Sequence, residues 1–141
     1  MSLSASESSV MEEAPLVAAY AALLALLFAG LSVRTLLLRR RFGMGLGDGG
    51  AVELERAVRA HGHFAEYVPF SLLLIYFVES HADSVLMVHF LASTLLIGRG
   101  LHAWGVSQVA ENYRFRVAGM VCTLVVLVGC SLQLLVGVVT T

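Results

Sequence analysis

Four long, largely apolar segments, separated by short polar stretches, constrain the fold of this chain more than any other feature. About 20 residues of α-helix cross a bilayer core, and each of the four segments reaches or exceeds that length. Short connections between consecutive helices favour antiparallel neighbours. The pattern predicts an all-α integral membrane protein, a four-transmembrane-helix up-down bundle with helices at about 14–38, 52–79, 84–106 and 114–138.

The composition agrees with a chain that lies in lipid. Of its 141 residues, 58% are hydrophobic and 13% are charged, whereas a soluble domain carries about 25% charged residues. The net charge of −1 argues against nucleic acid as a partner, because nucleic-acid binding requires clustered basic residues. Residues 1–13 are polar, acidic and rich in serine, so we expect a disordered tail before a single membrane domain at residues 14–141.

The arginines gather at one predicted face of the membrane. Arg39, Arg40 and Arg41 follow the first helix, and Arg114 and Arg116 begin the last one. The tail and the polar turn at residues 80–83 contain no arginine. Because cytoplasmic loops carry the excess of basic residues in membrane proteins, we expect both termini on the non-cytoplasmic side.

Ionisable residues interrupt the first half of the second helix. Arg59, His63 and Glu66 have the spacing i, i+4 and i+7, so they share one face of a helix. Ionisable groups are costly near hydrocarbon and usually face a bundle interior or a wet cavity. This face is therefore a candidate binding site, although an ion pair between Arg59 and Glu66 with a purely structural role is an alternative interpretation.

Polar residues of the other helices are predicted at the same depth. Arg34 lies near the end of the first helix, and Arg99 and His102 lie three residues apart near the end of the third. Interfacial anchoring explains any single arginine. It does not explain His63, Glu66 and His102, which should lie deeper than an anchor requires.

The chemistry of this layer suits a small ligand with carboxylates and an ammonium group. Arginine binds carboxylates through directional, charge-assisted hydrogen bonds, and a glutamate such as Glu66 accepts an amine. A further arginine near a thiol favours the reactive thiolate. A zinc site is a poorer fit, because His61 and His63 are two residues apart and point to different faces of the helix.

Several stretches of the chain resemble the MAPEG family, the membrane-associated proteins in eicosanoid and glutathione metabolism. The main stretch is LERAVRAHGHFAEYVP at residues 54–69, with the element Arg-x3-(Asn or His)-x2-Glu-(Tyr/Phe)-x-Pro. GDGG at 47–50, GRGLH at 98–102 and RFRVAGM at 114–120 are similar to small bacterial members. The resemblance covers nearly the whole chain after the tail. It implies a homotrimer that binds glutathione between neighbouring subunits, near the cytoplasmic side.

The resemblance also implies roles for individual residues. Arg59 would contact a glutathione carboxylate and Glu66 the γ-glutamyl ammonium, while Tyr67 and His63 would line the same pocket. Arg99 matches the arginine of the third-helix motif, and Arg34 is similar to a first-helix arginine of eicosanoid-forming members. Activation of the thiol would fall to Arg114 or Arg116. The chain departs from the family at two positions, with His63 in place of a frequent asparagine and His102 in place of a tyrosine found in some members.

The function that the resemblance implies is a glutathione-dependent membrane transferase or peroxidase acting on lipophilic electrophiles or hydroperoxides. Glutathione would be the cosubstrate, with no metal, and the second substrate would arrive through the membrane lipid of a bacterial inner membrane. The alternative is a non-enzymatic membrane protein that binds a lipid or a partner, because the family includes such a member. A small transporter or channel subunit fits less well, since the outer half of each helix has almost no polar lining.

Overall fold

The computed structural model describes residues 15–81, 84–110 and 112–140, and these form four α-helices and no strand. The predicted tail at residues 1–13, together with Ala82 and Asp83 of the predicted turn, lies outside the described residues. The all-helical class predicted from the sequence is confirmed. The helices are α1 (Leu16–Phe42), α2 (Val52–His81), α3 (Val85–Ser107) and α4 (Tyr113–Thr140).

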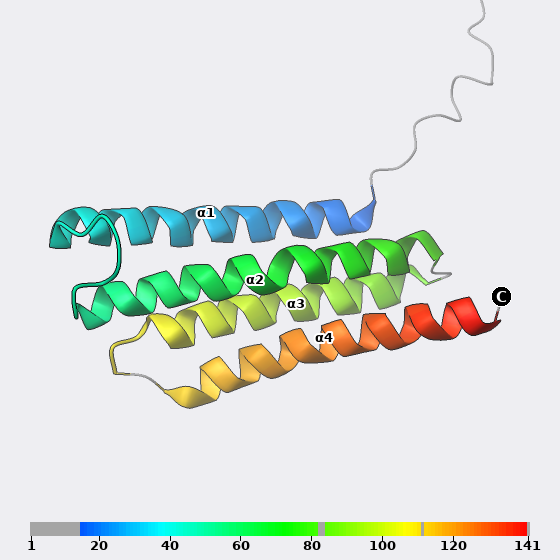
Figure 1. Ribbon diagram of the computed structural model, residues 1–141. Helices are drawn as coiled ribbons and strands as arrows, with labels where there is room; N and C mark the ends of the chain where they lie inside the picture. Colours follow the sequence, from blue (N-terminus) through cyan, green and yellow to red (C-terminus); the bar gives the residue numbers. More distant parts are fainter. Residues whose placement is uncertain (1–14, 82–83, 111, 141) are drawn as a thin grey trace, which may run out of the picture.

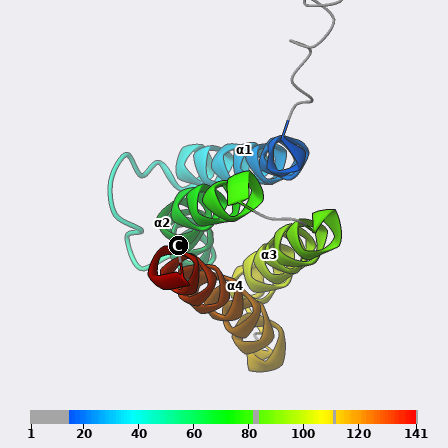
Figure 2. The same ribbon diagram turned by 90° about the vertical axis from the view of Figure 1, so that its right-hand side faces the viewer.

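The helices run side by side and alternate in direction (Figure 1). The α1–α2 and α3–α4 connections lie at one end of the bundle, which we call the loop end. Viewed from the opposite end, α1 and α4 lie on opposite sides of α2 and α3 (Figure 2). Among the described residues α1 and α4 do not contact each other, so each leaves a broad outer face uncovered within the protomer.

Three of the helices are long and apolar enough to cross a membrane, namely α1, α3 and α4. Their uncovered faces carry large apolar side chains, and Leu26 of α1 is 71% exposed while Leu135 of α4 is 63% exposed. Water would penalise so much apolar surface, whereas lipid does not. The second helix falls short of the same criterion because its first half carries charged residues and two histidines.

The first helix extends further than the predicted end at residue 38. It includes Arg39, Arg40 and Arg41 in its last turn and ends where Gly43 adopts a left-handed conformation, with φ of 64°. Cationic side chains at a helix C-terminus interact favourably with the helix dipole, and glycine adopts the left-handed cap without strain. These two effects explain why the arginine run continues the helix.

Polar contacts fasten α1 at both ends. At its start, the Glu79 carboxylate of α2 accepts hydrogen bonds from the backbone N–H groups of Leu16 and Val17, which have no partner within the helix. Near the loop end, the Arg34 guanidinium donates to the Ser107 hydroxyl at 2.5 Å and to the Ser107 carbonyl at 3.2 Å. Glu79 of α2 and Arg34 of α1 itself therefore hold α1 in register with α2 and α3.

The third and fourth helices meet at backbone distance through glycines. A methyl group on Gly119 would lie 2.5 Å from the backbone nitrogen of His102, and one on Gly105 would lie 2.6 Å from the backbone nitrogen of Arg116. Small residues permit such close helix approach in membranes. The contact places the start of α4 directly against the end of α3, beside the first half of α2.

We expect Gly119→Ala to lower the stability of the protein by about 1–3 kcal/mol, because the added methyl group meets backbone atoms of α3 that cannot move without separating the helices. Thermal unfolding in detergent measures the change. Gly129→Ala is the control on the same helix, since nothing lies within 4 Å of an added methyl group there. Equal unfolding midpoints for the two variants would contradict the close packing of α3 and α4.

Candidate functional site

Two hollows adjoin the first half of α2 at the loop end of the bundle. The first has a volume of about 430 Å³, and its lining residues are Val52, Glu55, Arg56, Arg59, His63, Val106 and Arg116. The second has a volume of about 340 Å³, and its lining residues are Gly47, Asp48, Glu55, Val58, Arg59, Gly62, His63 and Glu66. Glu55, Arg59 and His63 line both hollows, so we treat the two as one polar site.

Helical periodicity accounts for the face of α2 that borders the polar site. Glu55, Arg59 and His63 follow one another at intervals of four residues, so they lie in a row on one side of the helix. The neighbouring row, which includes Ala60 and Phe64 and is turned by about 100° around the helix, is buried in the core. The amphipathic start of α2 thus buries its apolar face and leaves its ionisable face to the hollows.

The α1–α2 connection forms one wall of the polar site. Arg39 donates hydrogen bonds to the carbonyls of Gly45 and Gly47, both at 3.1 Å. The Asp48 carboxylate accepts a hydrogen bond from the Gly50 N–H at 2.9 Å, closing a turn. These bonds hold Gly47 and Asp48 against α2, where they line the second hollow.

The ends of α3 and α4 form the other wall. Arg56 of α2 donates a hydrogen bond to the Val106 carbonyl at 3.3 Å, which holds the end of α3 against α2. Arg116 reaches the first hollow from the start of α4. Arg114, two residues earlier, is exposed and lines neither hollow. Of the two arginines that could activate the thiol, the structure brings only Arg116 to the polar site.

Two histidines connect α2 to α3 and α4 behind the polar site. His63 Nδ1 lies 3.1 Å from His102 Nε2, and His102 Nδ1 lies 3.1 Å from the Arg116 carbonyl oxygen. His102 is buried, whereas His63 is partly exposed to the hollows. The two residues at which the chain departs from the pattern of the family that it resembles are therefore partners of each other.

Arg99 is the most unusual buried residue of the bundle. Its side chain is 0% exposed, and its three guanidinium nitrogens have no hydrogen-bond partner among the described residues. The guanidinium lies over the rings of Phe64 and Tyr67, at 5.6 and 5.7 Å from their centroids. The face of an aromatic ring attracts a cation, but it accepts no conventional hydrogen bond from the N–H groups. Arg99 therefore has buried hydrogen-bond donors that are unsatisfied.

The remaining predicted site residues lie at the margins of the polar site. Glu66 lines the second hollow, and the ring of Tyr67 faces the Arg99 guanidinium. Arg34 lines neither hollow and instead bonds to Ser107. Arg34 therefore connects α1 to the end of α3 and does not face the polar site.

The observed geometry bears on two features that the sequence raised, an ion pair between Arg59 and Glu66 and a metal site at His61 and His63. Arg41 and Glu53 form an ion pair at 3.5 Å, but among the described residues no ion pair within 4 Å joins Arg59 and Glu66, although their spacing allows one. His61 turns away from His63, toward α1, where its Nε2 lies 3.1 Å from the Ser32 hydroxyl. Across residues 15–81, 84–110 and 112–140, no cluster of three or more His, Cys, Asp or Glu side chains could hold a metal ion.

Sequence reasoning omitted some lining residues from the site. Glu55 and Arg56 both line the first hollow. Glu55 could have been predicted, because it precedes Arg59 and His63 at intervals of four residues. Val106 comes from α3 and Asp48 from the α1–α2 connection. No pattern within one segment predicts which residues of distant segments will line the polar site.

The fold and the polar site define a class of protein: a four-helix membrane-associated bundle with an ionisable layer at its loop end. The MAPEG family model matches residues 17–136, which covers all but the ends of the chain. The chain belongs to the MAPEG family.

Two curated relatives are similar over most of their length. Inner membrane protein YecN of Escherichia coli strain K12 is 37% identical over 119 residues, which is 84% of this chain and 86% of the relative. The protein of the same name from Escherichia coli O6:H1 has the same identity and coverage. The name of these relatives states a location and no activity.

We expect Arg99→Met to raise the stability of the ligand-free protein by about 1–3 kcal/mol, because methionine removes buried donors that have no acceptor. Thermal unfolding of detergent-purified protein measures this. Arg34→Met is the control and should lower the unfolding midpoint, since it removes the bonds to Ser107. A lower midpoint for Arg99→Met would show that the guanidinium has acceptors in the purified protein.

Proposed function

We propose that this protein is a glutathione-dependent membrane transferase or peroxidase acting on lipophilic electrophiles or hydroperoxides. The observation that carries the proposal is the polar site, in which two glutamates, three arginines and a histidine from two helices surround adjoining hollows. Membership of the MAPEG family, which includes glutathione transferases and peroxidases, supports the proposal.

The lining residues fit the chemistry of glutathione, which has two carboxylates, an ammonium group and a thiol. Arg59 supplies a planar guanidinium for one carboxylate, and Glu66 or Glu55 supplies a carboxylate for the ammonium. Arg99 lines neither hollow, but its buried donors have no acceptor among the described residues, and it is the further cation that we assign to the second carboxylate. The donor set therefore matches each charged group of the ligand with an opposite charge.

Arg116 is the arginine that we assign to the thiol. A guanidinium close to a thiol stabilises the thiolate, which is the nucleophilic form. Arg116 lines the first hollow together with Arg59 and His63, and Arg114 does not. The thiolate would then attack an electrophile that reaches the site from the surrounding lipid.

The proposal includes the assembly and its position in the membrane. We propose a homotrimer in which the uncovered faces of α1 and α4 contact neighbouring subunits and lipid, and in which α2 crosses the bilayer beside the other three helices. The location is the bacterial inner membrane, as the name of the relatives suggests. The arginines at the loop end favour a cytoplasmic position for that end, with the opposite end outside.

The glutathione proposal makes separate predictions for the arginines. Arg59→Ala should weaken glutathione binding about 10- to 100-fold, because one charge-assisted hydrogen bond is lost. Arg116→Ala should retain binding but lose the thiolate absorbance. Calorimetry and ultraviolet spectroscopy of detergent-purified protein measure both effects, with Arg114→Ala as the control. No binding by the unaltered protein at cellular glutathione concentrations would refute the proposal, and loss of the thiolate in Arg114→Ala would reverse the assignment.

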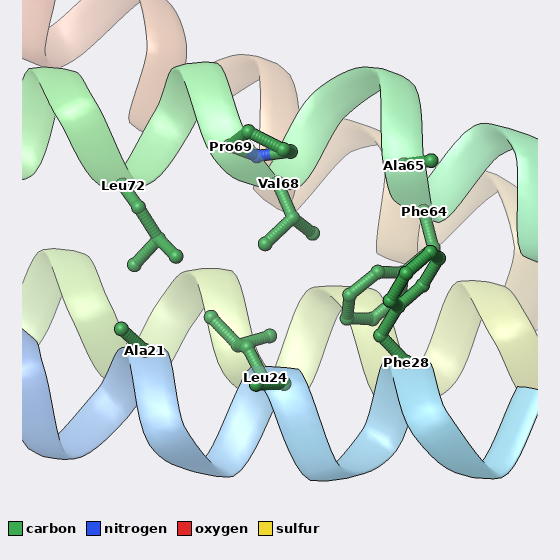
Figure 3. A pocket seen from close by; sticks show the side chains of 9 residues that line it. Ala21, Leu24, Phe28, Phe64, Ala65, Val68, Pro69 and Leu72 are labelled. Atoms are coloured by element: carbon green, nitrogen blue, oxygen red, sulfur yellow. The ribbon is translucent and has the colours of Figure 1, made fainter.

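A second candidate function, lipid binding without catalysis, is favoured by an apolar groove between α1 and α2. The groove has a volume of about 300 Å³. Figure 3 shows Ala21, Leu24 and Phe28 of α1 opposite Phe64, Val68 and Leu72 of α2. Every lining side chain is apolar, so the groove suits a hydrocarbon chain. Phe64 separates this groove from Arg99.

Filling the groove distinguishes the two candidates. Ala21→Phe should reduce the lipid that remains bound after purification, as counted by mass spectrometry, and should leave glutathione binding unchanged. Ala29→Phe is the control, since Ala29 is an exposed residue of α1 outside the groove. Bound lipid in the unaltered protein, together with no glutathione binding, would favour the non-enzymatic function.

A further inference from the structure

The hydrogen bonds of the histidine pair determine which ring nitrogen carries each proton. The Arg116 carbonyl can only accept, so the His102 Nδ1 that lies 3.1 Å from it carries a hydrogen. In a neutral imidazole the other nitrogen is then an acceptor, so His102 Nε2 accepts from His63 Nδ1–H. His63, also neutral, is left with an unprotonated Nε2.

The geometry leaves that Nε2 available for chemistry in the polar site. His63 lines both hollows, and its Nε2 has no hydrogen-bond partner among the described residues. His61 provides a contrast within the same helix. Its ring stacks on Phe28 with centroids 4.7 Å apart, and its Nε2 contacts Ser32. His61 is thus packed and satisfied, whereas His63 is held at one nitrogen and open at the other.

The charged groups around His63 come from three helices. Arg59 and Glu66 belong to α2, Arg99 to α3 and Arg116 to α4, while the neutral His102 of α3 contacts His63 directly. The arginines favour an anion in the hollow and disfavour a cation on the histidine. A thiolate formed beside His63 would change this balance, because an adjacent negative charge stabilises an imidazolium.

We propose that His63 is the base that accepts the proton of the bound thiol, and that His102 is a positioning residue that fixes the tautomer of His63. This inference rests on the proposed glutathione-dependent function. The S–H bond breaks, its proton binds to His63 Nε2, and the electron pair remains on sulfur as a thiolate beside Arg116. When the thiolate adds to an electrophile, the imidazolium returns the proton to the product, so the protein ends in its starting state.

Counting protons during glutathione binding tests the role of His63. Calorimetry in buffers of different ionisation enthalpy gives the protons released, and ultraviolet absorbance gives the thiolate formed. The unaltered protein should release almost no protons to the buffer per thiolate, because His63 retains them. His63→Asn, which keeps a hydrogen-bond donor but cannot bind the proton, should release about one proton per thiolate and lower kcat about 100-fold or more.

A pH series separates loss of the base from damage to the fold. In His63→Asn the thiolate should recover as the pH is raised, since hydroxide replaces the missing base. His61→Asn, the same substitution two residues away, should behave as the unaltered protein. The same proton release per thiolate in His63→Asn and in the unaltered protein would overturn the inference.

The role of His102 is tested by two substitutions of similar size. His102→Gln offers an amide oxygen to His63 and an amide N–H to the Arg116 carbonyl, so it should retain most of the activity. His102→Leu removes both bonds and should lower kcat while glutathione affinity is retained. Equal activities of the two variants would contradict the positioning role.

The same measurements distinguish failure of this inference from failure of the proposed function. If the unaltered protein does not bind glutathione, the proposed function fails and the role of His63 fails with it. If it binds glutathione as a thiolate and releases a full proton to the buffer, the proposed function stands and the inference about His63 is wrong.

Discussion

An ionised side chain inside a lipid-spanning bundle costs free energy unless the fold supplies counter-charges, acceptors or a wet cavity, and the whole loop end of this protein is arranged around that cost. Arg34 is compensated by a hydrogen bond to the Ser107 hydroxyl, and Arg56 by a hydrogen bond to the Val106 carbonyl. Arg59 faces the hollows, where water or an anionic ligand can compensate its charge. Among the residues that the structure describes, Arg99 is compensated only by two aromatic rings. Arg99, whose guanidinium nitrogens have no hydrogen-bond acceptor among the described residues, thus lies directly behind the polar site.

The chemistry of the site depends on a contact made by residues that carry no chemistry. Gly105 and Gly119 let α3 and α4 approach at backbone distance. This approach puts the Arg116 carbonyl within 3.1 Å of His102 and the Arg116 side chain beside the first hollow. The contact between α3 and α4 therefore positions both the Arg116 side chain, a cation for an anionic ligand, and the Arg116 carbonyl, which orients the histidine pair.

The second helix divides the protomer into two chemical environments. Its row of Glu55, Arg59 and His63 borders the polar site, and its row of Phe64, Val68 and Leu72 borders the apolar groove (Figure 3). A protein that joins a water-soluble thiol to a lipophilic molecule needs both environments close together. The separation by a single helix supports the proposed function, and it also explains why a lipid-binding role is the natural competitor.

The local properties of the chain were sufficient to predict the four helices, the membrane class and the face shared by Arg59, His63 and Glu66, because helical periodicity and apolar length depend only on neighbours in sequence. The extension of α1 through its arginines was missed, although the cap at Gly43 was visible in the sequence. The burial of Arg99, the pairing of His63 with His102 and the choice of Arg116 over Arg114 depended on the tertiary structure. Each of these depends on how far two distant helices are rotated and how closely they approach, and no spacing within one segment contains that information.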